Sequence, residues 1–159
     1  MRQSLWLILF CGLWACVTAC SSADCPDNQN SLPVAGFYAP DGYGEMSPVT
    51  LDSISIYGSD APADTMLLDK ERGVSQVYLP FRITQQSTTF VLDYLRDGLK
   101  DKITFNYELS PRFVSSECGV VYDYKITSIT HTDELIDSVT CPAGVITNTP
   151  GENLRIYLR

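Results

Sequence analysis

Tryptophan and histidine are nearly absent from this chain. Of its 159 residues two are Trp and one is His, and both tryptophans, Trp6 and Trp14, lie close to the N-terminus. A zinc site built on imidazoles needs more than one histidine, so His131, which precedes acidic residues, is expected to be a solvated loop residue. Any aromatic binding surface after the N-terminal segment has to be built from Tyr and Phe.

Basic residues are scarce as well. Eleven Lys and Arg stand against 19 Asp and Glu, which gives a net charge of −8. Nucleic-acid binding needs clustered positive charge, so the composition excludes nucleic acid as a partner. The acidic residues are scattered along the sequence, which predicts a soluble, self-repelling surface.

Long apolar runs are also missing, apart from residues 5–17. This run is 13 residues long and follows Arg2. A transmembrane helix needs about 20 apolar residues, whereas the apolar core of a signal peptide needs about 7–15. The small residues Thr18 and Ala19 come next, as a cleavage site requires. Residues 1–19 are therefore predicted to be a signal peptide.

The segment Val17-Thr18-Ala19-Cys20 resembles the lipobox of bacterial lipoprotein precursors. The resemblance implies that residues 1–19 are removed and that Cys20 is lipidated, with three acyl chains that make the anchor effectively permanent. Ser21 after the cysteine implies the outer membrane. The predicted location is the bacterial cell envelope, on either the periplasmic or the surface face of the membrane.

Two other cysteines fit lipidation less well, because Cys11 follows a Phe and Cys16 follows a Trp-Ala pair. An ordinary secretory signal that is cleaved near Ala19 or Ala23, without a lipid, is the alternative.

Residues 20–33 are predicted to be a lipidated tether, and residues 34–159 to be a single domain. The 140 residues from Cys20 onward carry ten basic against 19 acidic side chains, a net charge of −9. If Cys20 is lipidated, Cys25, Cys118 and Cys141 remain, which permits at most one internal disulfide. We expect a Cys25–Cys118 bridge that staples the tether to the sheet, with Cys141 as a buried thiol. A Cys118–Cys141 bridge is the alternative pairing.

Apolar and polar residues alternate almost everywhere after Pro33, which is typical of strands. No segment has a convincing helical period. The candidate strand segments cover residues 34–38, 49–57, 65–68, 76–81, 88–95, 102–109, 112–116, 120–129, 135–141 and 154–158. Eight or nine short strands from among these ten segments favour an all-β, antiparallel, immunoglobulin-like β-sandwich. A closed antiparallel barrel is the alternative.

Three polar segments resemble sites only superficially. The stretches from Asp41 to Glu45 and from Asp60 to Asp64 bring carboxylates close together, but neither has the ligand order of a calcium loop. Residues 115–119, Ser-Ser-Glu-Cys-Gly, lack the spacing of a catalytic triad. We expect turns at all three places, and we expect no metal and no cofactor.

The chain resembles a family of short, uncharacterised lipoproteins from Bacteroidetes with a β-sandwich-like domain of unknown function. The motifs that carry the resemblance are Cys25, Val77-Tyr-Leu-Pro-Phe81, Asp101-Lys-Ile-Thr-Phe-Asn-Tyr107, Phe113-Val-Ser-Ser-Glu-Cys-Gly119, His131-Thr132, Ile136-Asp-Ser-Val139 and Glu152-Asn-Leu-Arg-Ile-Tyr157. The resemblance implies the sandwich and fits the Cys25–Cys118 bridge. It implies no activity.

The sequence therefore predicts a lipid-anchored envelope protein that is not an enzyme and acts as a structural or interaction module. Its expected partners are the membrane, through the lipid, and an unidentified envelope protein or glycan. The alternative is a glycan- or peptide-binding module that uses exposed tyrosines among Tyr38, Tyr43, Tyr57 and Tyr78. A hydrolase is a third possibility and would need polar residues that converge in one pocket.

Overall fold

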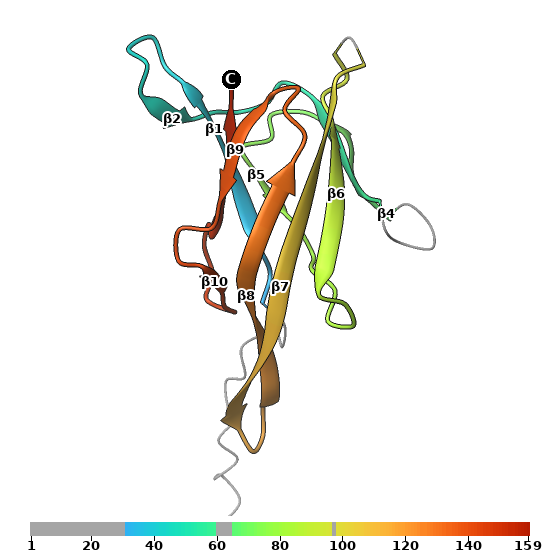
Figure 1. Ribbon diagram of the computed structural model, residues 1–159, viewed down its shortest axis with the longest axis vertical. Helices are drawn as coiled ribbons and strands as arrows, with labels where there is room; N and C mark the ends of the chain where they lie inside the picture. The colour runs from blue at the N-terminus through green and yellow to red at the C-terminus, as the bar shows by residue number, and fades with distance from the viewer. Residues whose placement is uncertain (1–30, 60–64, 97) are drawn as a thin grey trace, which may run out of the picture.

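Eleven strands form two sheets in the computed structural model, which describes residues 31–59, 65–96 and 98–159 (Figure 1). The strands are β1 (Val34–Pro40), β2 (Met46–Pro48), β3 (Ile54–Gly58), β4 (Thr65–Glu71), β5 (Gln76–Tyr78), β6 (Ser87–Asp93), β7 (Lys100–Ser115), β8 (Gly119–His131), β9 (Ile136–Thr140), β10 (Val145–Ile146) and β11 (Leu154–Leu158). The described residues contain no helix of the length and apolarity that crossing a membrane requires. The predicted signal peptide and residues 20–30 of the predicted tether lie outside the described residues.

The six-stranded sheet has the order β10-β8-β7-β6-β3-β4, and the five-stranded sheet has the order β2-β1-β11-β9, with β5 also paired to β1. Neither order closes on itself, so the prediction of a β-sandwich is confirmed and the barrel is not formed. All pairs are antiparallel except β1 and β11, in which Ala35 lies opposite Leu154 and Tyr38 opposite Tyr157. Parallel neighbours need a long connection, and here the rest of the domain supplies it.

The core lies between the two sheets and is filled by the alternating apolar residues. Ile103, Phe105 and Tyr107 of β7 point into it, whereas Thr104 and Asn106 between them are half-buried. The other sheet contributes residues such as Phe37 and Ile156, which are 1 % and 0 % exposed. Burial of this kind contributes about 25 cal/mol for each Å² of apolar surface, and it is what the period of two in the sequence predicts.

Phe81 joins the two sheets. It follows β5 of one sheet and precedes β6 of the other, and it is 7 % exposed. Its ring centroid lies 5.0 Å from that of Phe105, 4.8 Å from that of Tyr107 and 5.3 Å from that of Tyr124. This aromatic cluster closes the core at the end of the sandwich from which β7 and β8 continue.

The prediction that Pro111 breaks a strand is wrong. β7 runs through Pro111, which pairs with Tyr122 of β8. Pairing between β6 and β7 stops at Ser87 and Asn106, so β7 has no described neighbour on its other edge at Pro111. Proline lacks an N–H and is tolerated on such an edge. The segments 102–109 and 112–116 are therefore one strand.

The predicted strand at 49–57 is shorter than expected. Only Ile54–Gly58 is strand, while Leu51 makes an isolated bridge to Val74. The short strands β2 and β10, with three and two residues, do not appear in the prediction, because so few residues cannot show an alternating pattern.

A buried carboxylate holds the connection between β8 and β9. Asp101 of β7 is 0 % exposed, and its Oδ1 accepts hydrogen bonds from the Thr132 hydroxyl at 2.6 Å and the Glu134 N–H at 3.0 Å. Its Oδ2 accepts from the Leu135 and Ile136 N–H groups at 2.9 and 3.1 Å and from the hydroxyl of Tyr94 at 3.1 Å. These donors use both oxygens, so Asp101 serves the fold.

Candidate interaction site

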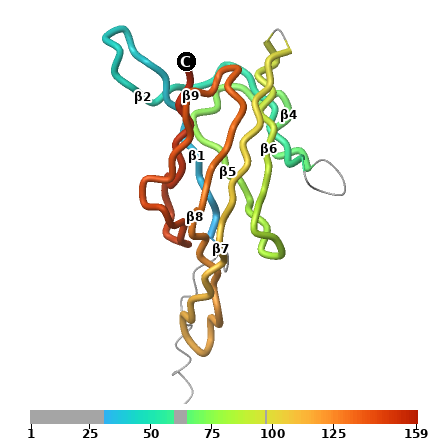
Figure 2. The backbone as a smooth tube through the Cα atoms, in the orientation of Figure 1, coloured from blue at the N-terminus to red at the C-terminus, as the bar shows by residue number. Residues whose placement is uncertain are grey.

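The paired ends of β7 and β8 project past the rest of the sandwich as a two-stranded arm, residues 110–123 (Figures 1 and 2). The pairing continues from Ser110 and Asp123 to Ser115 and Gly119. Six residues at about 3.3 Å each give an arm of ~20 Å. At the tip the Ser115 hydroxyl accepts hydrogen bonds from the Glu117 and Cys118 N–H groups, at 3.2 and 3.0 Å. Gly119 has a φ of 75°, which a turn of this kind requires and which favours glycine.

An apolar stripe runs along one face of the arm. Phe113 and Val120 lie directly opposite each other and are 68 % and 44 % exposed. Pro111 and Tyr122 are opposite each other two residues further back, and therefore lie on the same face. The next pair on this face includes Tyr124, which is buried in the core. The stripe, defined as Pro111, Phe113, Val120 and Tyr122, thus continues the core-facing side of the sheet beyond the sandwich.

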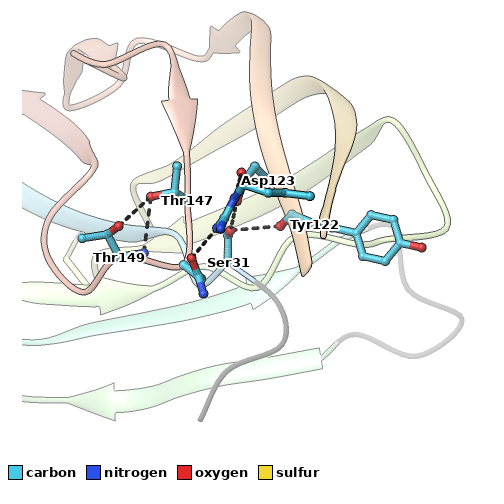
Figure 3. A network of polar contacts seen from close by, with 7 residues as sticks. Ser31, Tyr122, Asp123, Thr147 and Thr149 are labelled. Atoms are coloured by element: carbon cyan, nitrogen blue, oxygen red, sulfur yellow. Dashed lines mark hydrogen bonds and ion pairs between the residues drawn. The ribbon is translucent and has the colours of Figure 1, made fainter. Parts of the chain in front are cut away.

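A polar clasp fixes the root of the arm to the start of the domain (Figure 3). Ser31 is 2 % exposed, and its hydroxyl lies within hydrogen-bond distance of the Tyr122 carbonyl at 2.9 Å and of the Asp123 carboxylate at 3.3 Å. Arg112 donates to the same carboxylate from Nε at 2.9 Å and to the Asn148 side chain from a terminal nitrogen at 2.6 Å. The chain therefore enters the domain beside the arm, and the last residues of the predicted tether, 31–33, pack against the domain.

A second polar surface covers the outer face of the five-stranded sheet. The rings of Tyr38 and Tyr157 are 5.4 Å apart, and the Arg155 guanidinium lies 5.4 Å from the centre of the Tyr38 ring. Glu152 accepts hydrogen bonds from the Tyr38 hydroxyl at 2.7 Å and from Arg155 at 3.1 Å. The Glu152 carboxylate lies over Gly36, where a Cβ would collide with it. The missing side chain at Gly36 therefore leaves room for the Glu152 carboxylate beside Tyr38. We define the tyrosine face as Tyr38, Glu152, Arg155 and Tyr157.

The four tyrosines named from the sequence do not form one cluster. Tyr43 is 96 % exposed in the turn after β1, and Tyr78 is exposed beside Val34 at the other end of β1. Tyr57 is half-buried in the other sheet, and Tyr38 bonds to Glu152. Tyr157, which was not among the four candidate binding tyrosines, is the ring that pairs with Tyr38.

The described surface also has shallow hollows. A hollow of about 400 Å³ lies near the C-terminus, with Val49, Leu51 and Leu158 in its lining and Asp52 and Arg159 among its polar residues. This volume is within the range of about 300–1,000 Å³ that ligand pockets occupy. A smaller hollow of about 90 Å³ lies near the arm, between Leu32, Tyr78 and residues 147–151.

The polar segments singled out in the sequence form local structure where they are described. The Asp41 carboxylate accepts from the Tyr43 and Glu45 N–H groups at 2.8 and 3.0 Å, which confirms a turn. His131 is the last residue of β8 rather than a loop residue. Asp60 and Asp64 lie outside the described residues. Within the described ranges no three His, Cys, Asp or Glu side chains are placed so that they could hold a metal ion.

The structure separates the cysteines into two environments. Cys118 lies at the tip of the arm and is not free, whereas Cys141 carries a free thiol and is half-buried after β9. Burial raises the pKa of the Cys141 thiol. The alternative Cys118–Cys141 bridge is therefore not formed. Cys20 and Cys25 lie outside the described residues, so lipidation of Cys20 and the Cys25–Cys118 bridge stay predictions.

The arm is the feature that sequence reasoning missed. The sequence predicted strands at 112–116 and 120–129 with a turn at residues 115–119, but it ended the preceding strand at Pro111. The alternating pattern carries no information on where the opposing sheet ends. No local signal in the sequence marks the arm, because the lengths of β7 and β8, 16 and 13 residues, are seen to exceed those of the other strands only in the structure.

A family model, described as a family of unknown function and designated DUF6452, matches residues 53–158. This range runs from just before β3 to the end of β11 and includes the whole arm. Comparisons with curated proteins and with solved structures gave no match. The matched range covers well over half of the sequence, and the chain belongs to the DUF6452 family of unknown function.

Proposed function

We propose that this protein is a lipoprotein of the bacterial cell envelope, anchored through Cys20, and that its β-sandwich acts as a non-enzymatic interaction module. The observation that carries the proposal is the clasp at Ser31. It fixes the point at which the chain enters the domain, eleven residues after Cys20. The lipobox-like segment before Cys20 supplies the anchor.

The reach of the tether follows from its length. A fully extended chain spans at most about 3.6 Å per residue, so the eleven steps from Cys20 to Ser31 reach ~40 Å. The arm end of the sandwich is then close to the membrane. The opposite end, with the C-terminus and the hollow of about 400 Å³, faces away from the membrane and is accessible to partners.

Ser21 after the lipidated cysteine and the resemblance to lipoproteins of Bacteroidetes support the outer membrane as the location. An acidic surface also supports a role in the envelope without nucleic acid. The partner in this proposal is an envelope protein or a glycan.

Replacing Cys20 by Ser is expected to move nearly all of the protein from the membrane fraction to the soluble fraction. Each buried methylene of a lipid contributes about 0.8 kcal/mol to membrane binding, and the variant loses every acyl chain. Membrane fractionation and mass spectrometry of the mature N-terminus measure the effect. Cys16→Ser, within the predicted signal peptide, is the matched control and should stay in the membrane. An unmodified N-terminus in the wild-type protein contradicts the proposal and supports the ordinary secretory signal.

A second candidate function is glycan binding on the tyrosine face. The observation that favours it is the pair of half-buried rings at Tyr38 and Tyr157 beside a carboxylate and a guanidinium on the outer face of the five-stranded sheet. Aromatic rings offer large contact area, and polar groups beside them provide orientation.

Glycan binding can be tested by NMR titration of the soluble domain with oligomers of glucose and of N-acetylglucosamine. The expected result is binding that Tyr157→Ala weakens about tenfold, which corresponds to roughly 1.4 kcal/mol. Tyr43→Ala, in a turn away from the face, should bind as the wild type does. Equal weakening in both variants, or no shift at Tyr38 and Tyr157, would remove this candidate.

A further inference from the structure

The arm carries little charge in a protein that is otherwise acidic. Residues 110–123 contain Arg112, Glu117 and Asp123 as their only ionisable acidic or basic side chains. Arg112 and Asp123 form an ion pair at 2.9 Å, which leaves Glu117 at the tip. Most of the acidic residues therefore lie outside the arm, and the arm itself adds little electrostatic repulsion from anionic lipid.

The apolar stripe on the arm has the composition of a membrane-interface contact. Phe113 is 68 % exposed and Val120 is 44 % exposed, and Tyr122 behind them is half-buried. Tyr and Phe rings are favoured at the boundary between headgroups and acyl chains, because that boundary takes up apolar rings together with a polar tip. An exposed cross-strand pair of Phe and Val makes no contribution to the core.

The position of the arm favours the bilayer as its partner. Ser31 is bound at the root of the arm, and the chain that leaves it reaches a lipidated Cys20 within ~40 Å. The turn between β1 and β2, which carries the most exposed tyrosine, lies at the other end of β1 (Figure 2). The root of the arm therefore stays within ~40 Å of a membrane that holds the lipid, whereas the turn between β1 and β2 lies at the far end of the sandwich.

We propose that the stripe of Pro111, Phe113, Val120 and Tyr122 lies in the interfacial layer of the bilayer to which Cys20 anchors the protein. This inference rests on the proposed lipid anchor. The stripe is a second, weak attachment that sets the orientation of the sandwich on the membrane. A tether converts such a contact into an intramolecular event, so a small apolar area is sufficient. Glu117 at the tip remains at the level of the headgroups, so the arm lies along the surface.

The predicted absence of tryptophan from the mature chain makes a direct test possible. In Phe113→Trp the new ring is the only tryptophan after Cys20. Tyr43→Trp places the same probe in the turn between β1 and β2 and is the matched control. Each variant is prepared as the full lipidated protein and reconstituted into vesicles of phosphatidylethanolamine and phosphatidylglycerol, with and without brominated acyl chains. Flotation reports the anchor, and tryptophan emission reports the environment of the probe.

The expected result is that both variants float with the vesicles, that the emission of Phe113→Trp shifts to shorter wavelength, and that brominated lipid quenches it. Tyr43→Trp should keep the emission of a water-exposed ring and resist quenching. Val120→Trp, across the strand pair from Phe113, should behave as Phe113→Trp does and covers the case in which that variant fails to fold.

Unchanged emission at positions 113 and 120 in protein that floats would overturn the arm inference and leave the anchor intact. A shift to shorter wavelength without quenching by brominated lipid would also overturn it, because a second protein molecule would then cover the stripe. Lipid-modified protein is required for flotation, so failure to float would instead overturn the proposed anchor and the inference that rests on it.

Discussion

Replacing Asp101 by Ala is expected to lower the free energy of unfolding by about 3–5 kcal/mol. The substitution leaves the Thr132 and Tyr94 hydroxyls and three backbone N–H groups without their acceptor in a buried site. An unsatisfied buried donor costs about 1–3 kcal/mol, and hydrogen bonds to a charged group are the stronger ones. Urea unfolding of the soluble domain measures the difference.

The matched control is Asp133→Ala. The Asp133 side chain is 80 % exposed and lies 3.6 Å from Arg159, so its removal should change stability by no more than about 0.5 kcal/mol. A loss below about 1 kcal/mol in Asp101→Ala, with an unchanged dependence on urea, would show that the connection between β8 and β9 does not need the carboxylate.

The same carboxylate gives stability a defined dependence on pH. Burial by itself would raise the pKa of Asp101, but the Thr132 hydroxyl and the N–H groups of residues 134–136 hold it below its ordinary value. A carboxyl with a lowered folded-state pKa stabilises fully above its unfolded-state pKa, which is about 3.9 for Asp. That contribution is lost as pH falls through the folded-state value. The difference in stability between the wild type and Asp101→Asn should therefore narrow below about pH 4.

Replacing Phe81 by Ala is expected to cost about 3–5 kcal/mol of stability, whereas Phe113→Ala should stay within about 0.5 kcal/mol. Both variants remove the same ring. Phe81 is 7 % exposed and stacks on Tyr107, while Phe113 is 68 % exposed on the arm. Because both variants replace Phe by Ala, the comparison separates the effect of burial on stability from the effect of the residue type. Thermal or urea unfolding of the soluble domain measures it.

The pair of variants also bears on the role of the arm. A Phe113→Ala protein with unchanged stability leaves the ring free for a role outside the fold, which is what the proposed membrane contact requires. A loss of several kcal/mol in Phe113→Ala would mean that the arm is part of the folding core, and it would contradict the description of the stripe as an exposed surface.

Much of the fold could be predicted from the sequence, because a half-buried strand carries a period of two that no other element produces. The segment from Ile103 to Tyr107 is the clearest case, and its apolar members are the residues that are buried. Pro111 misled the prediction, because the rule against proline in strands depends on whether the strand has neighbours on both edges. That is a property of the sheet and not of the segment.

The candidate sites were harder to predict from the sequence than the fold was. Glu152 and Tyr38 are 114 residues apart, and nothing local marks them as neighbours. The parallel pairing of β1 with β11 brings Tyr38 beside Tyr157, and the missing side chain of Gly36 leaves the space that the Glu152 carboxylate occupies.

By itself the sequence determined the class of the fold, the acidic and tryptophan-poor character of the chain, and the expectation of an N-terminal lipid anchor, because each depends on composition or on residues close together in the chain. Only the tertiary structure decided that β7 and β8 outrun the opposing sheet and that Ser31 is held at the root of the arm. The length of a strand relative to the sheet across from it depends on contacts between distant segments. Phe113 in an alternating strand therefore has the sequence signature of a core residue, but among the described strands none of the other sheet lies opposite it, and its ring is exposed.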